Sequence, residues 1–389
     1  MRSARAAGRG VLTAPARAAG WGVLGAFTAP AFALLIALTV STALLAAVGA
    51  SPGRTYLTML EFGVRPDSLV SAVNRAAIYF FAGLAVAVGF RMRLFNIGVE
   101  GQYHIAALFA AVAGAAVDLP GPLRLALICL VAVLAGAVWA GIAAVLKVWR
   151  GVSEVLSTLL LNYIATAVIA YLLAEVFAAG SATGSTPELP PSARLPELDG
   201  LPALFGLSLP AGTHLGGAVL GAVVLGVAVH LMLTRTRYGY DLKVSGLNPE
   251  AARVHGIDPR RMILITMLVS GGLAGLAGLP DLLGNTYRYG VDFPSGAGFT
   301  GIAVAMLGRN TPFGIALSAL LFGFLERSAL ILDIQGIPKE IVTIMQGVIV
   351  ISVVVAHELV RRLDLRRAAR LMREQPAPAV TPAPMRSAT

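Results

Sequence analysis

Residues 125–146 read LALICLVAVLAGAVWAGIAAVL and contain no charged side chain. An α-helix needs about 20 mostly apolar residues to cross the roughly 30 Å of hydrocarbon in a bilayer, and this stretch is long enough. Inside lipid the backbone must satisfy its own hydrogen bonds, which a single segment can do only as a helix. The stretch therefore predicts a transmembrane helix and decides the class of the fold.

The composition of the whole chain agrees with this prediction. Of its 389 residues, 57% are hydrophobic and only 13% are charged, whereas soluble domains contain about 25% charged residues. The length would allow two or three soluble domains, but the apolar excess favours one continuous membrane domain. The single cysteine, Cys129, can form no internal disulfide and does not indicate a redox compartment.

Nine further apolar segments flank residues 125–146, so we predict an all-α membrane protein of about ten transmembrane helices. The ten segments are 27–50, 69–90, 95–117, 125–146, 155–174, 215–233, 262–279, 299–307, 313–325 and 341–356. The eighth is too short to cross a bilayer alone. Short or glycine-rich apolar segments often belong to broken helices beside a substrate path.

The distribution of Arg and Lys predicts that both termini face the cytoplasm. The net charge is +10, and the basic residues gather at both ends of the chain and in every second loop. Basic loops remain on the cytoplasmic side, which an even number of crossings satisfies. The charge therefore indicates membrane topology rather than binding to nucleic acid. The first apolar run is too long for a secretory signal, so we expect a retained first helix.

This topology divides the chain into three parts. A basic cytoplasmic segment, 1–26, precedes the membrane domain 27–356, and a basic cytoplasmic tail, 357–389, follows it. The tail begins as an amphipathic helix on the membrane surface and ends in the disordered stretch PAPAVTPAP. The membrane domain has a Pro-rich external loop, 178–213, which can pack on the outer face, and an internal loop, 234–261.

The sequence lacks the common signatures of catalysis. It contains no Gly-Lys dipeptide and therefore no Walker A phosphate loop. Its five histidines are scattered, and no Gly-X-Ser-X-Gly motif is present. We therefore expect a transport path without metal or cofactor, not an enzyme. Any ATP must be hydrolysed by another polypeptide.

The internal loop contains a short predicted helix, in the stretch GLNPEAARVHG at 246–256. Asn248 suits the N-cap, Pro249 the first helical position, and Glu250 the positive end of the helix dipole. Gly256 can adopt the left-handed conformation that ends a helix. So short a helix is not stable alone in water. From these residues it is either a connector or a helix that docks into a partner.

Polar residues open the third segment, FNIGVEGQ at 95–102. Asn96 and Glu100 are four residues apart, and a helix would place them on one face. Ionisable groups at membrane depth usually face a cavity or a partner, although this segment could also lie at the cytoplasmic interface, where Glu100 would be hydrated. In the fifth segment Asn162 is deep enough to need a partner, and we predict a hydrogen bond between helices.

Four motifs together resemble bacterial ABC importer permeases: FNIGVEGQ, STLLLNYIA at 157–165, the 246–256 stretch, and GFTGIAVAMLGR at 298–309 followed by Pro312. The chain is similar to the branched-chain amino acid and simple-sugar permease superfamily, in its nucleoside-importing branch. The similarity covers about 69–355, in order, and implies a type II importer fold. It also implies that the third and eighth segments are broken and line the translocation path.

The resemblance implies partners and functional residues as well. Such a permease pairs with a second, often non-identical permease, two ABC ATPase domains and an extracytoplasmic substrate-binding lipoprotein. The implied substrate-path residues are Asn96, Glu100, Gln102, Asn162 and Phe299. The implied ATPase-coupling residues are Gly246, Asn248, Pro249, Glu250, Ala251, Ala252, Arg253 and Gly256.

The implied substrate is a nucleoside, because aromatic, amide and carboxylate groups suit a nucleobase and a ribose. A simple sugar of the ribose or galactose type is the alternative. An ion-coupled secondary transporter is a further rival, but such proteins usually place charges near mid-membrane in several helices. Most segments here contain none.

Overall fold

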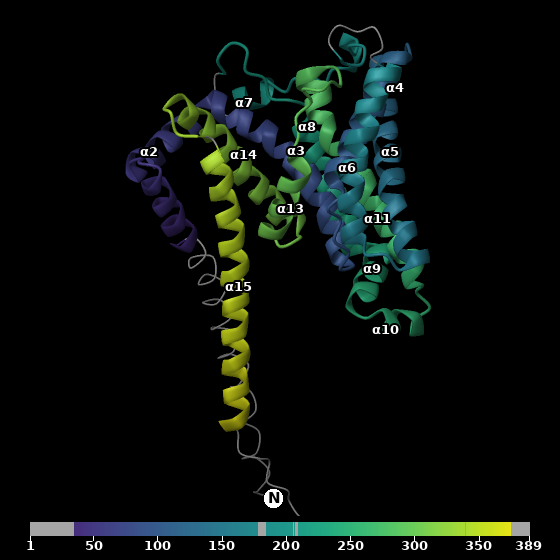
Figure 1. Ribbon diagram of the computed structural model, residues 1–389, viewed down its shortest axis with the longest axis vertical. Helices are drawn as coiled ribbons and strands as arrows, with labels where there is room; N and C mark the ends of the chain where they lie inside the picture. Colours follow the sequence, from purple (N-terminus) through teal and green to yellow (C-terminus); the bar gives the residue numbers. More distant parts are fainter. Residues whose placement is uncertain (1–34, 178–183, 205, 207–208, 339, 375–389) are drawn as a thin grey trace, which may run out of the picture. The chain divides into compact units, whose positions relative to one another are not determined.

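The computed structural model describes residues 35–177, 184–204, 206, 209–338 and 340–374, which are almost entirely helical (Figure 1). Within these residues, β-pairing is confined to two isolated bridges, Ser185 with Gly290 and Glu197 with Gly216. The all-α prediction is confirmed. The predicted N-terminal segment 1–26 and the disordered end of the tail lie outside the described residues.

The helices follow the order of the apolar segments. Their bounds are Leu35–Ala47, α2 Pro52–Gly63, α3 Pro66–Arg91, α4 Val99–Ala116, α5 Gly121–Arg150, α6 Glu154–Leu172, α7 Gly200–Leu204, α8 Ala218–Arg235, α9 Arg237–Leu247, α10 Pro249–Val254, α11 Pro259–Gly275, α12 Leu279–Asp281, α13 Ala297–Leu307, α14 Pro312–Ile334 and α15 Glu340–Glu374. Short 3₁₀ turns at Pro191–Ala193 and Leu276–Gly278 and π-helical turns at Leu173–Phe177 and Leu282–Thr286 complete the list.

Each of the ten predicted segments coincides with a helix, although residues 27–34 of the first are not described. In the part of the chain that the structure describes, six helices are long and apolar enough to cross a membrane. They begin at Pro66, Gly121, Glu154, Ala218, Pro259 and Pro312. A bent pair, Leu35–Ala47 with Pro52–Gly63, would make a seventh span, and Ala297–Leu307 and Glu340–Ala356 are shorter apolar helices. The chain is therefore a multi-pass membrane protein.

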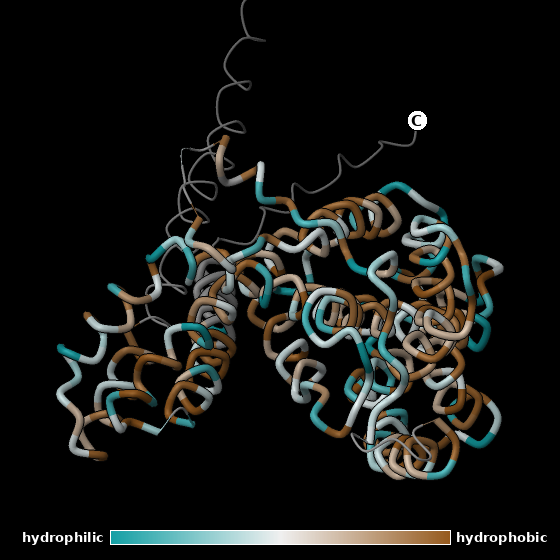
Figure 2. Tube along the Cα trace, turned by 90° about the horizontal axis from the view of Figure 1, so that it is seen from above, coloured by the Kyte–Doolittle hydropathy of each residue, from teal (hydrophilic) through white to brown (hydrophobic). Residues whose placement is uncertain are grey.

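Helix α3 forms the centre of the unit Ala43–Val350. It is buried over most of its length and packs against α11, α13 and α14. A helix that is apolar all round belongs inside a bundle or in lipid. In α5, by contrast, only 22% of the apolar window is buried, so most of its apolar surface is left for lipid or a partner. Hydrophobic residues occur all around the helices (Figure 2).

The contact between α5 and α11 depends on small residues. A Cβ added at Gly271 would collide with Ala140 and with the backbone of Gly136. Small residues let two helix backbones approach closely inside a membrane, where dispersion contacts drive packing. Gly271, in the seventh segment, therefore allows the close packing of α11 on α5.

The external-loop residues that the structure describes pack on one end of the bundle, which we call the loop end (Figure 1). The Thr186 N–H donates to the Tyr289 carbonyl (2.9 Å) and the Leu195 N–H donates to the Leu283 carbonyl (3.1 Å). Leu189 and Ala193 are buried. These contacts attach the loop to the connection between α11 and α13. Its residues 178–183, 205 and 207–208 are not described.

Helix α10 lies at the opposite end of the bundle, which we call the α10 end (Figure 1), and has the predicted start and stop. The Asn248 side chain accepts hydrogen bonds from the N–H groups of Glu250 (3.0 Å) and Ala251 (3.1 Å). At the C-terminus Gly256 has φ +77°, and the Ile257 N–H reaches back to the Ala252 carbonyl at 3.0 Å. This pattern is a Schellman motif, which satisfies carbonyls at the helix end.

The surroundings of α10 differ from the prediction in two ways. The helix is not isolated, because α9 directly precedes it and packs against it. Ala252 is fully buried, so it holds α10 in place and cannot contact a partner. The surface that α10 presents consists of Pro249, Glu250, Arg253 and Val254, of which Val254 is 86% exposed.

Helix α15 continues without a break from the last apolar segment to Glu374. The predicted basic helix after residue 356 is therefore an extension of the preceding segment rather than a separate element. The sequence explains this continuity, because no glycine or proline interrupts 348–374.

Candidate functional site

Two separate cavities open in the bundle. The first, of about 500 Å³, lies between α4, α6 and the residues that lead into α13, and we call it the α4–α6 cavity. Three of the five predicted substrate-path residues line it: Glu100, Asn162 and Phe299. Its wall also contains His104, Tyr163, Tyr289 and Phe293.

Glu100 holds the first turn of α13. Its carboxylate accepts hydrogen bonds from the backbone N–H groups of Gly296 (2.6 Å) and Gly298 (2.8 Å). These are among the donors that a helix N-terminus leaves without an intrahelical partner, and a carboxylate also complements the helix dipole there. The Glu100 side chain is 12% exposed, so most of it is shielded from solvent by the protein.

The approach of α13 to α4 requires a residue without a side chain. A Cβ added at Gly298 would overlap the backbone of Glu100. The neighbouring Phe299 is 49% exposed and points its ring surface to the cavity side of this contact. The Gly-Phe pair thus combines close backbone packing with an accessible aromatic ring.

Aromatic rings form one wall of the α4–α6 cavity. His104 stacks on Tyr103, with ring centroids 4.3 Å apart, and Tyr289 stacks on Phe293 at 4.6 Å. His104 Nδ1 lies 2.8 Å from the Tyr289 hydroxyl, and its Nε2 lies 3.4 Å from the Glu100 carboxylate. The wall therefore offers both flat apolar surface and an imidazole between a carboxylate and a phenol.

Asn162 joins α6 to the start of α4. Its side-chain oxygen accepts from the Gly101 N–H (2.9 Å), and its amide nitrogen donates to the Ile97 carbonyl (3.0 Å). Both partners are backbone groups at the start of α4, where a helix N-terminus leaves N–H groups without helical partners. The predicted hydrogen bond between helices is present. It connects a side chain of one helix with the backbone of the other.

Asn96 and Gln102 do not line either cavity. They are each 1% exposed and pair through their amides, with two hydrogen bonds of 2.9 Å. Asn96 also donates to Ser270 Oγ (2.9 Å), which itself donates to the Ala85 carbonyl (2.7 Å). This buried network connects α3, α4 and α11.

The expected stacking of Asn96 and Glu100 on one helix face is wrong. Helix α4 begins at Val99, so Asn96 precedes it. The Asn96 side chain instead accepts from the Gly98 N–H at 3.0 Å, a local turn in which Asn competes with helix formation.

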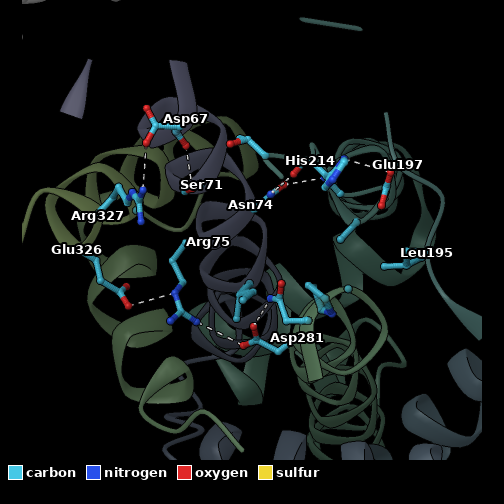
Figure 3. A pocket seen from close by; sticks show the side chains of 18 of the residues that line it. Asp67, Ser71, Asn74, Arg75, Leu195, Glu197, His214, Asp281, Glu326 and Arg327 are labelled. Atoms are coloured by element: carbon cyan, nitrogen blue, oxygen red, sulfur yellow. Dashed lines mark hydrogen bonds and ion pairs between the residues drawn. The ribbon is translucent and has the colours of Figure 1, made fainter. Parts of the chain in front are cut away.

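The second cavity, of about 640 Å³, lies at the loop end between α3, α12 and α14, and we call it the α3–α14 cavity (Figure 3). Arg75 points from α3 toward two carboxylates, with 3.1 Å from Nε to Glu326 and 3.4 Å from Nη1 to Asp281. Tyr79 donates to the other oxygen of Glu326. A second pair, Asp67 with Arg327 at 3.3 Å, lies on the same side.

His214 lies at the rim of the α3–α14 cavity and contacts two acids of the external loop. Its Nδ1 is 2.7 Å from Asp199 and 3.1 Å from Glu197. The ligand atoms of these three side chains lie within 4.8 Å of one another, close enough to share a metal ion. His214 Nδ1 already contacts both carboxylates.

This contact predicts a pH-dependent loop. The hydrogen bond with Asp199 raises the pKa of His214 above 6.5 and lowers the pKa of Asp199 below 3.8. The raised value means that the His214 contact is fully present below pH 6.5 and is lost as the pH rises through the raised pKa. The Asp199 contribution is lost at the acidic end, as the pH falls through the lowered pKa.

We expect His214, titrated by hydrogen exchange of its imidazole C2 proton and mass spectrometry, to show the raised pKa. Asp199→Asn should move that pKa back toward its ordinary value, because the charged partner is removed. His230, in α8, provides the internal control in the same experiment. An unchanged His214 pKa in Asp199→Asn would contradict the contact.

Several of these residues were not predicted. His104 follows Glu100 by four residues, a spacing that places both on one face of a helix and could have identified it. Tyr289 and Phe293 come from a connecting segment, where no helical periodicity indicates which way a side chain points. Arg75, Asp281 and Glu326 are far apart in the sequence, so only the fold reveals that they meet.

The comparisons with known proteins agree with this structure. Residues 68–354 match the family model "Branched-chain amino acid transport system / permease component". The chain is 33% identical to the glucose ABC transporter permease protein TsgB13 of Haloferax volcanii, over 85% of this chain and 88% of that protein. It is 35% identical to the guanosine ABC transporter permease protein NupP of Bacillus subtilis, over 74% and 81%, respectively.

A third relative is the nucleoside ABC transporter permease protein NupB of Lactococcus lactis, 30% identical over 77% of this chain and 86% of that protein. No solved structure matches the chain. The family model covers most of the membrane domain, including α10 and every lining residue of the two cavities except Asp67. The chain therefore belongs to the branched-chain amino acid transport system permease family and is a membrane-spanning ABC transporter permease.

Proposed function

We propose that the chain is one permease subunit of an ATP-driven importer and that its α4–α6 cavity is part of the path of a nucleoside. The observation that carries this proposal is the wall of stacked rings beside Glu100 and Asn162. Flat aromatic rings suit a nucleobase, and the carboxylate and amide groups suit its polar edge. The cavity volume, about 500 Å³, is within the range of small-molecule sites, about 300–1,000 Å³.

The relatives support a nucleoside and keep a sugar as the second candidate. Two of the proteins described above are named for guanosine and nucleosides, and one for glucose. The rings of Tyr289 and Phe293 could also pack against the apolar face of a hexose. Phe299 also lines the cavity and favours a nucleobase, because a further aromatic ring allows a planar group to be held between two ring surfaces.

The proposal includes the architecture of the assembly. We expect ten crossings, as in a type II importer, with broken third and eighth spans beside the path. In this arrangement both termini and α10 would lie in the cytoplasm. The basic segments 1–26 and 357–389 would then lie on the cytoplasmic side. An ABC ATPase docks at α10 and hydrolyses the ATP, while a substrate-binding lipoprotein delivers the solute at the loop end. This chain itself needs no cofactor.

A second permease, encoded by a different gene, would cover the α4–α6 cavity. The α6 residues beside it present Tyr163, 71% exposed, and Tyr171, 64% exposed. A polar cavity that opens sideways in a membrane needs such a cover, because Glu100 and Asn162 are costly to expose to lipid. Bacillus subtilis has two relatives that are both named guanosine ABC transporter permease proteins, NupP and NupQ, which supports two different subunits.

Reconstitution tests this function. Proteoliposomes that contain the chain with its ATPase and second permease, supplied with the binding lipoprotein, should take up tritiated uridine or guanosine only with ATP, and vanadate should stop uptake. Unlabelled glucose or ribose should compete poorly. Uptake by this chain alone, driven by an ion gradient, would contradict the importer. Competition by glucose but not by nucleosides would establish the sugar alternative.

A further inference from the structure

We propose that the α3–α14 cavity is a second binding site, which recognises neighbouring hydroxyl groups of a neutral solute. This proposal rests on the proposed function and adds which part of the solute is recognised at the loop end. The two cavities share no lining residue, so the site is separate from the aromatic wall. Its position at the loop end would bring it into contact with solute before the α4–α6 cavity.

The charges of this cavity indicate that it contains water. Arg75, Asp67 and Glu326 have side-chain exposures of 33%, 32% and 36%. Charged groups that faced hydrocarbon at this level would be costly, so they face a cavity that water can enter. An ion pair that only stabilised the fold would not need to face a cavity of about 640 Å³.

The balance of charge excludes an anionic ligand. Four carboxylates line the cavity, Asp67, Glu197, Asp281 and Glu326, against three cationic groups, the guanidinium groups of Arg75 and Arg327 and the imidazole of His214 when it is protonated. Both guanidinium groups already pair with carboxylates. A phosphate would meet more negative than positive charge, and like charges at these distances repel. The cavity therefore favours a neutral solute over a nucleotide.

The arrangement of donors and acceptors fits hydroxyl groups. Each hydroxyl donates one hydrogen bond and accepts others. Arg75 offers donors between two carboxylate acceptors, and in the part of the chain that the structure describes its Nη2 has no hydrogen-bond partner. Asn285 donates to Asp281 at 2.9 Å and adds a further polar group beside Arg75 and its two carboxylates. Two neighbouring hydroxyls could donate to Glu326 and Asp281 while they accept from Arg75.

The cavity also offers an apolar surface for the carbon face of a sugar ring. Ile78, Leu195 and Tyr287 are part of its lining. Tyr287 is fixed in position, because the Arg194 guanidinium lies 4.1 Å from its ring centroid and its hydroxyl donates to the Gly284 carbonyl at 3.1 Å. A ring that is held in this way loses little freedom when a ligand packs on it.

The proposal is tested by measuring the binding of two ligands to the wild-type complex and to a variant. Binding of tritiated uridine and of tritiated 2′,3′-dideoxyuridine, which lacks the two neighbouring hydroxyls, is measured by scintillation proximity on the reconstituted complex in nanodiscs. We expect the dideoxy compound to bind the wild-type complex at least about tenfold more weakly, because hydrogen bonds to charged groups contribute about 1.5–3 kcal/mol. Glu326→Gln should weaken uridine about tenfold and leave the dideoxy compound unchanged.

Asp292→Asn is the matched control. Asp292 is a loop-end carboxylate, 69% exposed and paired with Arg288, that lines neither cavity. It should leave both affinities unchanged. Uridine 5′-monophosphate should not compete in any variant, because the carboxylates repel its phosphate.

The outcomes separate this site from the proposed function. Equal loss of both ligands in Glu326→Gln would mean that Glu326 only supports the fold, and it would overturn the hydroxyl site. Equal binding of both ligands to the wild-type complex would also overturn it, even if ATP-driven uridine uptake stands. Binding of D-ribose but not uridine, abolished by Glu326→Gln, would support the site and overturn the nucleoside.

Discussion

Replacing Glu100 by glutamine is expected to destabilise the membrane domain by about 3 kcal/mol, a shift of more than about 100-fold in the folding equilibrium. The carboxylate accepts from both Gly296 and Gly298. A glutamine amide has one oxygen, so its NH₂ group must face one of these N–H donors. That donor remains buried without an acceptor, and α13 loses its attachment to α4.

Unfolding of the purified chain in mixed micelles of a mild detergent and SDS, followed by circular dichroism, measures this effect. Glu175→Gln is the control, because Glu175 is an exposed acid near the same cavity, at the end of α6, and a surface substitution usually changes stability by less than about 0.5 kcal/mol. Equal stability of Glu100→Gln and wild type would show that the carboxylate does not hold α13. ATP-driven uptake should fall with stability.

Replacing Val254 by aspartate is expected to weaken binding of the ATPase subunit by at least about 2 kcal/mol, roughly a 30-fold loss of affinity. Val254 is an apolar side chain at the tip of α10 and is 86% exposed. A well-packed partner cleft would desolvate it, and a charge in that cleft would be left unpaired. ATP-driven uptake should be lost at limiting ATPase concentration.

The affinity is measured by titrating the purified ATPase onto the permease in nanodiscs. Leu204→Asp is the matched control, because Leu204 is 79% exposed but belongs to α7, at the loop end. It should leave ATPase binding unchanged. Unaltered binding in Val254→Asp would remove α10 from the docking surface. Substitutions of Ala252 are unsuitable for this test, since its side chain is buried and a larger residue would disturb the fold.

The positions of the ten apolar helices were predictable from hydrophobicity alone. Each apolar segment coincides with a helix because lipid leaves the backbone no other way to form its hydrogen bonds. Helix α10 was equally predictable, since Asn248, Pro249 and Gly256 are local signals that act within one turn. Helix α9 was missed, because its stretch Arg237–Leu247 is short and mixed in polarity, and it is stabilised by its packing on α8 and α11.

The candidate site was predictable only in part, for a physical reason. A polar residue inside a membrane reveals that it needs a partner, but its sequence does not say whether the partner is substrate or backbone. Glu100 and Asn162 bind backbone groups at the edge of a cavity, whereas Asn96 and Gln102 bind each other in the interior. For the same reason, the sequence did not reveal the network of Arg75, which pairs with residues more than 200 positions away.

The hydrogen bonds that hold the starts of α4 and α13 have a consequence for biosynthesis. The partner that Gly101 needs, Asn162, is synthesised 61 residues later, and the donors for Glu100 are synthesised 196 and 198 residues later. Until then these polar groups must remain hydrated or be shielded by the insertion machinery. A truncated chain that ends before α13 would thus leave the ribosome with a Glu100 carboxylate that lacks two of its hydrogen-bond donors. The membrane domain can become stable only when its eighth segment has been inserted.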